Sequence, residues 1–292
     1  MSARRLPAVF MPDFMPDSMP GLSRKIWHGV FHRALPGLRA CALACVCAGA
    51  VTPVVAQTPQ TIRFAAEEWP PFVSDDLPDD GLSGAMLRTV LDRLGYTARI
   101  DYFPWKRAME LGLKDSRYAG FLAVWRTPER ETLCHFSAPV GNTLTVLVYL
   151  KDKPVRAAQV ADLRGVRIGT VGGFANGDEF DALARQGRLD VEEAVNDETN
   201  LRKLLARRFP AILMERRVLR YLLATRFGPV DRDRVAVNER LFRERPVHVC
   251  FKRTQAGLVQ QRAFNDAAKG VDFGQVEKDY WRRVGELGVP GN

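Results

Sequence analysis

Beyond the first sixty residues, short apolar runs alternate with segments whose apolar residues recur at helical spacing. This alternation predicts α/β layers with largely parallel sheets. In residues 83–94, one helical face collects Met86, Leu87, Val90 and Leu91. The predicted strands are 61–65, 98–103, 118–124, 143–150, 167–171, 189–194, 211–214 and 246–252. The predicted helices are 83–94, 105–113, 178–188, 198–206, 216–225, 256–268 and 275–287, with a helical turn at 160–163.

These predicted elements fall into two α/β series. A βαβαβ start covers residues 61–124, and a second series begins after the polar segment 151–154. No βα alternation follows residue 252, so we expect the last two helices to pack on one of the two existing units.

The first 57 residues are typical of a targeting segment. Basic residues precede an almost uncharged run, 40–56, and the small residues Val54-Val55-Ala56 suit a signal peptidase. We therefore expect a signal segment at 1–57 and export of the remaining chain. A retained anchor and a lipid attached at Cys45 are the alternatives. Neither is favoured, because the run is short for a membrane span and the lipoprotein pattern is incomplete.

The net charge of +9 over 292 residues does not by itself indicate a nucleic-acid partner. Residues 1–57 hold +4 of it, and the +5 that remains is only mildly basic. Basic runs such as Arg216-Arg217 fall at helical spacing without interleaved aromatic residues, so we read them as solvated helix faces and expect no nucleic-acid partner.

Motifs for nucleotide binding and for a serine nucleophile are absent from the sequence. Only His135 and His248 lie outside the targeting segment, and no metal-ligand spacing accompanies them. We expect no cofactor and no metal.

Two of the five cysteines, Cys134 and Cys250, lie outside the targeting segment. In an oxidising compartment such a pair favours a disulfide over a metal site. Two separately buried thiols are the alternative.

Aromatic and charged residues follow several predicted strands, at the sheet edge where α/β folds bind ligands. Trp69 follows the first strand and Trp105 the second, and each could form a ligand wall or pack in the core. After the third strand, Arg130 offers a planar guanidinium suited to a carboxylate, with an ion pair to Glu129 as the alternative. Glu215 ends a strand of the second series and could face a ligand cation.

Several short motifs occur in a fixed order along the chain. They are Trp69-Pro70-Pro71-Phe72, Gly81-Leu82-Ser83-Gly84, Pro104-Trp105-Lys106-Arg107, Thr127-Pro128-Glu129-Arg130, Phe136-Ser137-Ala138-Pro139, Asp162-Leu163-Arg164-Gly165 and Arg245-Pro246-Val247-His248. This ordered set resembles the family 3 extracellular solute-binding proteins, the polar amino-acid receptors of ABC importers.

The resemblance implies an α/β, two-lobed type II periplasmic binding protein fold with two hinge crossings. Lobe 1 would comprise residues 58–139 and 246–292, and lobe 2 residues 150–240. The crossings would be 140–149 and 241–245. A disulfide between Cys134 and Cys250 would then staple the hinge-proximal part of lobe 1.

The resemblance also implies roles for individual residues. Arg130 would grip a ligand carboxylate, Trp69 and Trp105 would wall the pocket, and Glu215 would hold an ammonium group. The other expected ligand-binding residues are Trp125, Thr127 and Phe174. Phe174-Ala175 replaces a usual carboxylate contact of the family, and four aromatic residues would line the cleft. A ligand other than a standard L-amino acid is therefore an alternative to an amino-acid-like one.

The predicted function is that of a periplasmic, monomeric receptor that closes on a small polar solute, amino-acid-like or carboxylate-bearing, and delivers it to the permease of an ABC importer. Two alternatives remain open. One is a sensory role with a membrane kinase as partner. The other is an enzyme similar to the periplasmic cyclohexadienyl dehydratases, with Glu215 as a shielded general acid.

Overall fold

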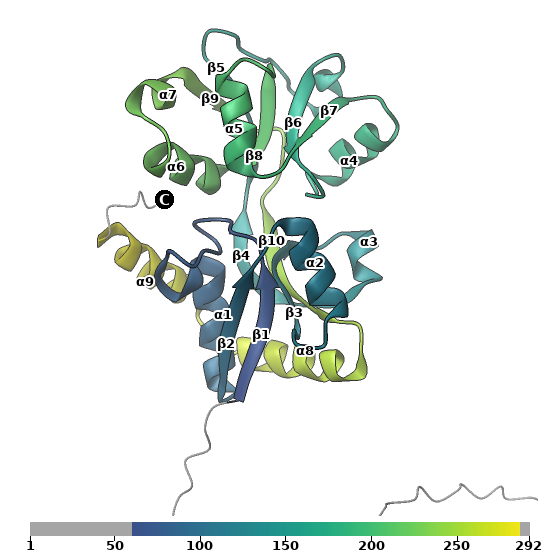
Figure 1. The fold of residues 1–292 in the computed structure, drawn as a ribbon, viewed down its shortest axis with the longest axis vertical. Helices are drawn as coiled ribbons and strands as arrows, with labels where there is room; N and C mark the ends of the chain where they lie inside the picture. The colour runs from purple at the N-terminus through teal and green to yellow at the C-terminus, as the bar shows by residue number, and fades with distance from the viewer. Residues whose placement is uncertain (1–59, 287–292) are drawn as a thin grey trace, which may run out of the picture. The chain divides into compact units, whose positions relative to one another are not determined.

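The computed structural model describes residues 60–286, which form an α/β structure with two five-stranded mixed sheets (Figure 1). The expected signal segment at 1–57 and its cleavage and lipidation signals lie outside the described residues. Within residues 60–286, none of the helices combines the length and apolar character needed to cross a bilayer.

The first sheet has the strand order β2-β1-β3-β10-β4. Its first three strands pair in parallel, and β10 runs antiparallel to both of its neighbours. The strands are β1 (Gln60–Ala66), β2 (Tyr96–Tyr102), β3 (Gly120–Trp125), β4 (Cys134–Thr143) and β10 (Arg245–Lys252). The accompanying helices are η1 (Pro78–Asp80), α1 (Leu82–Arg93), α2 (Trp105–Lys114), α3 (Pro128–Glu131), α8 (Gln255–Ala268) and α9 (Phe273–Glu286). We call these elements lobe 1.

The second sheet has the order β7-β6-β8-β5-β9, with β5 antiparallel to β8 and β9. Its strands are β5 (Thr145–Leu150), β6 (Arg167–Val171), β7 (Asp190–Ala194), β8 (Ala211–Glu215) and β9 (Val235–Asn238). The helices are η2 (Val160–Leu163), α4 (Asp178–Arg185), α5 (Asp197–Leu205), α6 (Arg216–Thr225) and α7 (Pro229–Arg234). We call these elements lobe 2.

The chain passes between the two sheets twice. Leu144 alone separates β4 from β5, and residues 239–244 join β9 to β10. The limits expected for the lobes and crossings stay a prediction.

The sequence analysis missed two strands and three short helices. Pro139 and Gly141 interrupt the alternation in β4, whose partner β10 lies about a hundred residues further along the chain. The strand β9 and the helices η1, α3 and α7 span only three to six residues each, too few to show a period. The longer elements show the expected burial, since α1 buries Met86, Leu87, Val90 and Leu91.

Candidate ligand-binding site

A cavity lies where the two lobes meet, and its walls are aromatic. Trp69, Trp105 and Trp125 come from lobe 1 and Phe174 from the loop after β6 in lobe 2. The other lining residues are Glu67, Leu122, Ala123, Arg130 and Ala175. The structure thus brings five of the seven expected binding residues to one place, and their role in binding stays a prediction.

An irregularity in β3 explains why consecutive residues line this cavity. Two residues of β3, Leu122 and Ala123, face a single residue of β10, because the register shifts between His248 and Cys250. Ala123 has φ of +60°, a left-handed conformation that costs about 1 kcal/mol in a residue with a Cβ. Such bulges turn side chains away from strict alternation. Leu122 and Ala123 therefore line the same cavity as Trp125.

Phe174 fills most of the space that the tryptophans enclose. Its ring stands edge-on to all three indoles, with centroid distances of 6.3 Å to Trp69, 5.7 Å to Trp105 and 6.5 Å to Trp125. The volume left is about 30 Å³, the room of about one water molecule. A solute that enters this cage must therefore displace the ring of Phe174.

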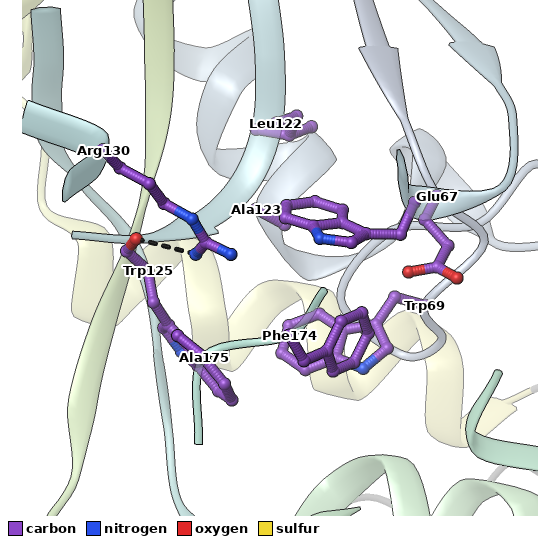
Figure 2. A pocket seen from close by; sticks show the side chains of 9 residues that line it. Glu67, Trp69, Leu122, Ala123, Trp125, Arg130, Phe174 and Ala175 are labelled. Carbon is purple, nitrogen blue, oxygen red and sulfur yellow. Dashed lines mark hydrogen bonds between the residues drawn. The ribbon is translucent and has the colours of Figure 1, made fainter. Parts of the chain in front are cut away.

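Arg130 is buried at one end of the cavity, opposite Glu67 (Figure 2). Its side chain is 8% exposed, and its guanidinium donates to the carbonyl oxygens of Trp125 at 3.0 Å and Gly173 at 3.1 Å. Burial lowers the pKa of Arg130 to about 10, although Glu129 and Asp181 partly oppose the shift. The group therefore stays charged at neutral pH.

A second guanidinium, that of Arg245, supports the same end of the site. It lies 4.1 Å from the centroid of the Trp125 ring and donates to the carbonyl oxygen of Ala175. Among the described residues, neither Arg130 nor Arg245 forms an ion pair with a carboxylate. A buried cation and a half-buried one, whose hydrogen-bond partners are carbonyl oxygens, would suit an anionic group of a ligand.

Gly173 and Phe174 of lobe 2 contact the groups of lobe 1 that line the cavity. The carbonyl oxygen of Gly173 accepts hydrogen bonds from Arg130 and from Nε1 of Trp105, the latter at 3.0 Å. The adjacent ring of Phe174 fills the cage. This loop of lobe 2 therefore supplies an acceptor oxygen and an aromatic group to the groups of lobe 1.

Thr127 and Glu215 do not line the cavity. The hydroxyl of Thr127 caps α3 by accepting from the backbone N–H of Arg130, so it positions Arg130 from outside. The carboxylate of Glu215 accepts from the backbone N–H groups of Leu144 at 3.1 Å and Val218 at 2.8 Å. The expectation that Glu215 faces the ligand is not met in this geometry, because both of its oxygens hold the start of α6 and the passage at Leu144.

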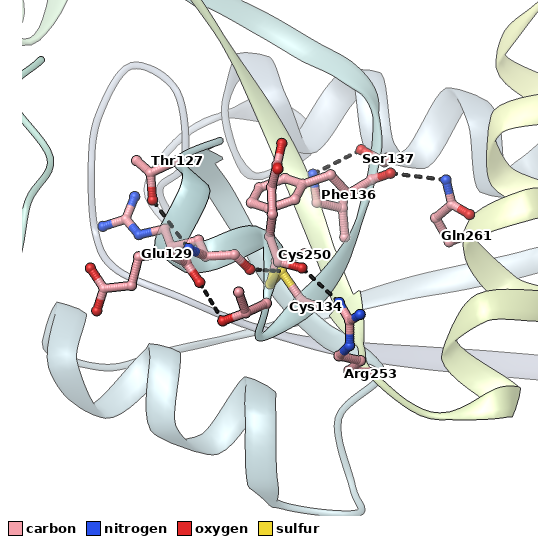
Figure 3. The surroundings of a disulfide bond; sticks show 12 residues. Thr127, Glu129, Cys134, Phe136, Ser137, Cys250, Arg253 and Gln261 are labelled. Atoms are coloured by element: carbon pink, nitrogen blue, oxygen red, sulfur yellow. Dashed lines mark hydrogen bonds between the residues drawn. A yellow bond between two sulfur atoms is a disulfide. The ribbon is translucent and has the colours of Figure 1, made fainter. Parts of the chain in front are cut away.

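The disulfide between Cys134 and Cys250 lies beside the helix that carries Arg130 (Figure 3). It joins the start of β4 to β10, with the two Cα atoms 5.5 Å apart, as the pairing expected from the sequence requires. Nearby, Arg253 donates to the carbonyl oxygen of Glu131 at 2.6 Å. The segment behind Arg130 is thus fixed to the sheet.

Three residues that matter here were not singled out as site residues from the sequence. Glu67 lines the cavity, Arg245 supports Trp125, and Asp197 accepts a hydrogen bond from Nε1 of Trp69 at 3.0 Å. Glu67 stands directly after the first strand, a position that could have identified it. Arg245 and Asp197 meet the site only through contacts between segments distant in sequence.

Replacing Phe174 by alanine is expected to raise the affinity for a solute that fills the cage. The ring competes with such a solute, and burying a phenylalanine side chain is worth roughly 1.5–3 kcal/mol, so its removal should tighten binding about tenfold or more. Calorimetric titration measures the change. Phe242→Ala is the matched control, because Phe242 packs on Phe180 outside the cavity. Weaker binding by Phe174→Ala would show that the ring assists the solute instead.

The proteins found to be similar to this chain are similar in structure. Neither models of known protein families nor the curated proteins include a match to this chain. The ligand-binding core of GluR0 from Nostoc punctiforme, in complex with L-glutamate, is 18% identical, with 75% of this chain and 99% of that chain covered and a TM-score of 0.61.

Two further solved structures illustrate the range of similar proteins. One is an amino acid ABC transporter substrate-binding protein from Streptococcus pneumoniae bound to L-arginine, at 14% identity, 79% and 96% coverage and a TM-score of 0.62. The other is an ancestral amino-acid-binding protein described as a precursor of cyclohexadienyl dehydratase, at 15% identity, 75% and 94% coverage and a TM-score of 0.56. Together with the two mixed sheets, these likenesses show that the chain has the two-lobed type II periplasmic binding protein fold.

Proposed function

We propose that this protein is an exported solute-binding receptor of the family 3 type, whose two lobes close on a small solute that carries a carboxylate. The observation that carries the proposal is the cavity between the lobes, where Arg130 stands beside three indoles. A charged guanidinium next to aromatic walls suits an organic anion with an apolar or aromatic part.

A receptor that closes on its solute is supported by the contributions of both lobes to the site. Trp69 and Asp197 share a hydrogen bond across the lobes, and Lys106 pairs with Glu193 at 3.3 Å. A ligand that contacts both lobes stabilises their closed arrangement by its differential contacts. Amino acids are bound by the similar structures, so amino-acid-like carboxylates come first among the solutes to test.

The proposed partner is the membrane permease of an ABC importer, and the proposed location is the periplasm. The similarity to an ABC transporter substrate-binding protein supports the permease, and the signal-like segment supports export. A monomer would suffice, since both halves of the cavity come from one chain. A membrane sensor kinase is the alternative partner, because it would require the same closing lobes.

We place binding without chemical conversion ahead of a dehydratase function. Glu215, the general acid of the dehydratase alternative, does not line the cavity. Both of its carboxylate oxygens accept hydrogen bonds from backbone N–H groups. Burial raises the pKa of Glu215 to about 7, against the opposing effect of these hydrogen bonds, but a shielded proton must also reach the solute. Incubation with prephenate or arogenate should therefore yield no aromatic product in the ultraviolet spectrum.

Native mass spectrometry of the gently purified protein tests the binding function. We expect a co-purified small carboxylate, or saturable binding when amino acids and aromatic carboxylates are added in turn. The absence of any bound species across that panel would contradict the proposal.

A further inference from the structure

A second cleft of about 360 Å³ shares Glu67 and Trp69 with the aromatic cavity. Both lobes line it, and acidic side chains dominate its lining. These are Glu67, Glu68, Asp75, Asp76, Asp197 and Glu198. Arg226 is the one basic residue among the described residues that line this cleft. The cleft therefore has a strongly negative lining.

Glu67 is the unusual member of this set because part of its carboxylate has no partner. The side chain is 9% exposed, and its Oε2 atom is buried without a hydrogen bond from any described residue. Burial raises the pKa of Glu67 to about 8, and the charge of Asp197 adds to the shift, while the backbone N–H of Trp105 opposes it. A buried acceptor in this state lacks a donor or a cation.

Asp197 approaches from lobe 2, at the first turn of α5. It is 7% exposed, and its one hydrogen bond from a side chain comes from the indole of Trp69. Burial raises the pKa of Asp197 to about 7, with the Trp69 bond opposing and Glu215 adding to the shift. Neither Glu67 nor Asp197 forms an ion pair within the described part of the chain, whereas Glu198 pairs with Arg202.

We propose that this acidic cleft binds a small organic cation with a primary ammonium group, held between Glu67 of lobe 1 and Asp197 of lobe 2. Because Oε2 of Glu67 is shielded from solvent in this arrangement, the amine would reach it while the lobes are apart. An ammonium then has three donors, enough for this oxygen and for Asp197 together. The lining also includes the rings of Trp69 and Tyr221, which suit the methylene groups and the charge of an organic amine. The inference rests on the proposed receptor function, because the two carboxyl groups meet where the lobes close.

The test is calorimetric titration of the full mature protein with 1,4-diaminobutane at pH 8. We expect saturable binding, and Glu67→Gln should weaken it by about tenfold to a hundredfold, the worth of one buried charge-assisted contact. Glu129→Gln is the matched control, because it removes the same charge from an exposed position on α3, outside the cleft. The affinity of this control variant for the diamine should change by less than about twofold, because exposed charges contribute little.

The pH dependence separates a direct contact from a structural effect. Protons compete with the amine for Glu67 and Asp197, so affinity should fall as the pH is lowered from 8 to 6, and binding at pH 7 should release protons. The heat of binding will then differ between buffers of unlike ionisation enthalpy. The pH dependence of the affinity should be weaker in Glu67→Gln. That variant should be at least as stable as the wild type at pH 8, because a carboxyl with a raised pKa destabilises the folded state as the pH rises through that pKa.

The outcomes distinguish this inference from the receptor function. If carboxylate solutes bind and the diamine does not, the cation site is overturned and the receptor function stands. Equal weakening by Glu67→Gln and Glu129→Gln, or equal saturable binding of Mg²⁺, would also overturn it. If neither class of solute binds, the receptor function fails as well.

Discussion

Removal of the disulfide between Cys134 and Cys250 is expected to lower the free energy of unfolding by about 4 kcal/mol. The bond closes a loop of 116 residues that contains the whole of lobe 2, and long loops gain most from closure in the chain-entropy model. Both sulfur atoms are buried, so a double alanine variant also loses a little packing. Urea unfolding of Cys134→Ala/Cys250→Ala against the oxidised wild type measures the loss.

Reduced wild-type protein is the control for this experiment, because it keeps both sulfur atoms and loses only the bond. It should show most of the loss seen in the double variant. An unchanged free energy of unfolding after verified reduction would mean that lobe 1 is fixed by its sheet and helices alone. Solute binding should weaken in parallel, since the bond fixes the segment that follows Arg130.

Replacing Arg130 by alanine should weaken the binding of a carboxylate solute by about thirtyfold to a hundredfold. A buried charge-assisted contact is worth roughly 2–3 kcal/mol, and this guanidinium is almost fully shielded from water. Calorimetry with the solute identified by mass spectrometry measures the loss. Arg130→Lys should retain part of the affinity, because it keeps the charge and loses the planar pair of donors.

Arg126→Ala is the matched control for Arg130. Arg126 lies four residues earlier, is exposed, and pairs with Glu131 on the surface. Its loss should change affinity by less than about twofold, in keeping with the small worth of exposed ion pairs. Similar affinities for wild type and Arg130→Ala would remove Arg130 from the proposed site.

The two α/β series could be predicted because their longer elements show their period in the sequence, and the two-lobed fold was implied by the resemblance to a known family. The helix α1 and the strand β3 appear where the apolar pattern places them. The strand β4 could not be predicted, since Pro139 and Gly141 break the alternation and its pairing depends on distant β10.

For the candidate site, too, some features could be predicted from the sequence and others could not. Trp69, Trp105 and Arg130 were expected at the site from their positions after strands, and they line the cavity, while their role in binding stays a prediction. The displacement of Glu215 from the cavity follows from a cap at α6 that the sequence does not reveal, because Glu at a strand end suits either role. The filling of the cage by Phe174 depends on how the lobes meet, which no local pattern encodes.

The central claim is that a solute carboxylate meets Arg130 inside the tryptophan cage. A crystal structure of the protein with its co-purified or added carboxylate solute tests this claim most directly. The account predicts a carboxylate oxygen within hydrogen-bond distance of the Arg130 guanidinium, in place of the Gly173 carbonyl, with the Phe174 ring moved out of the cage. A solute bound elsewhere, with Phe174 still between Trp69, Trp105 and Trp125, would contradict it.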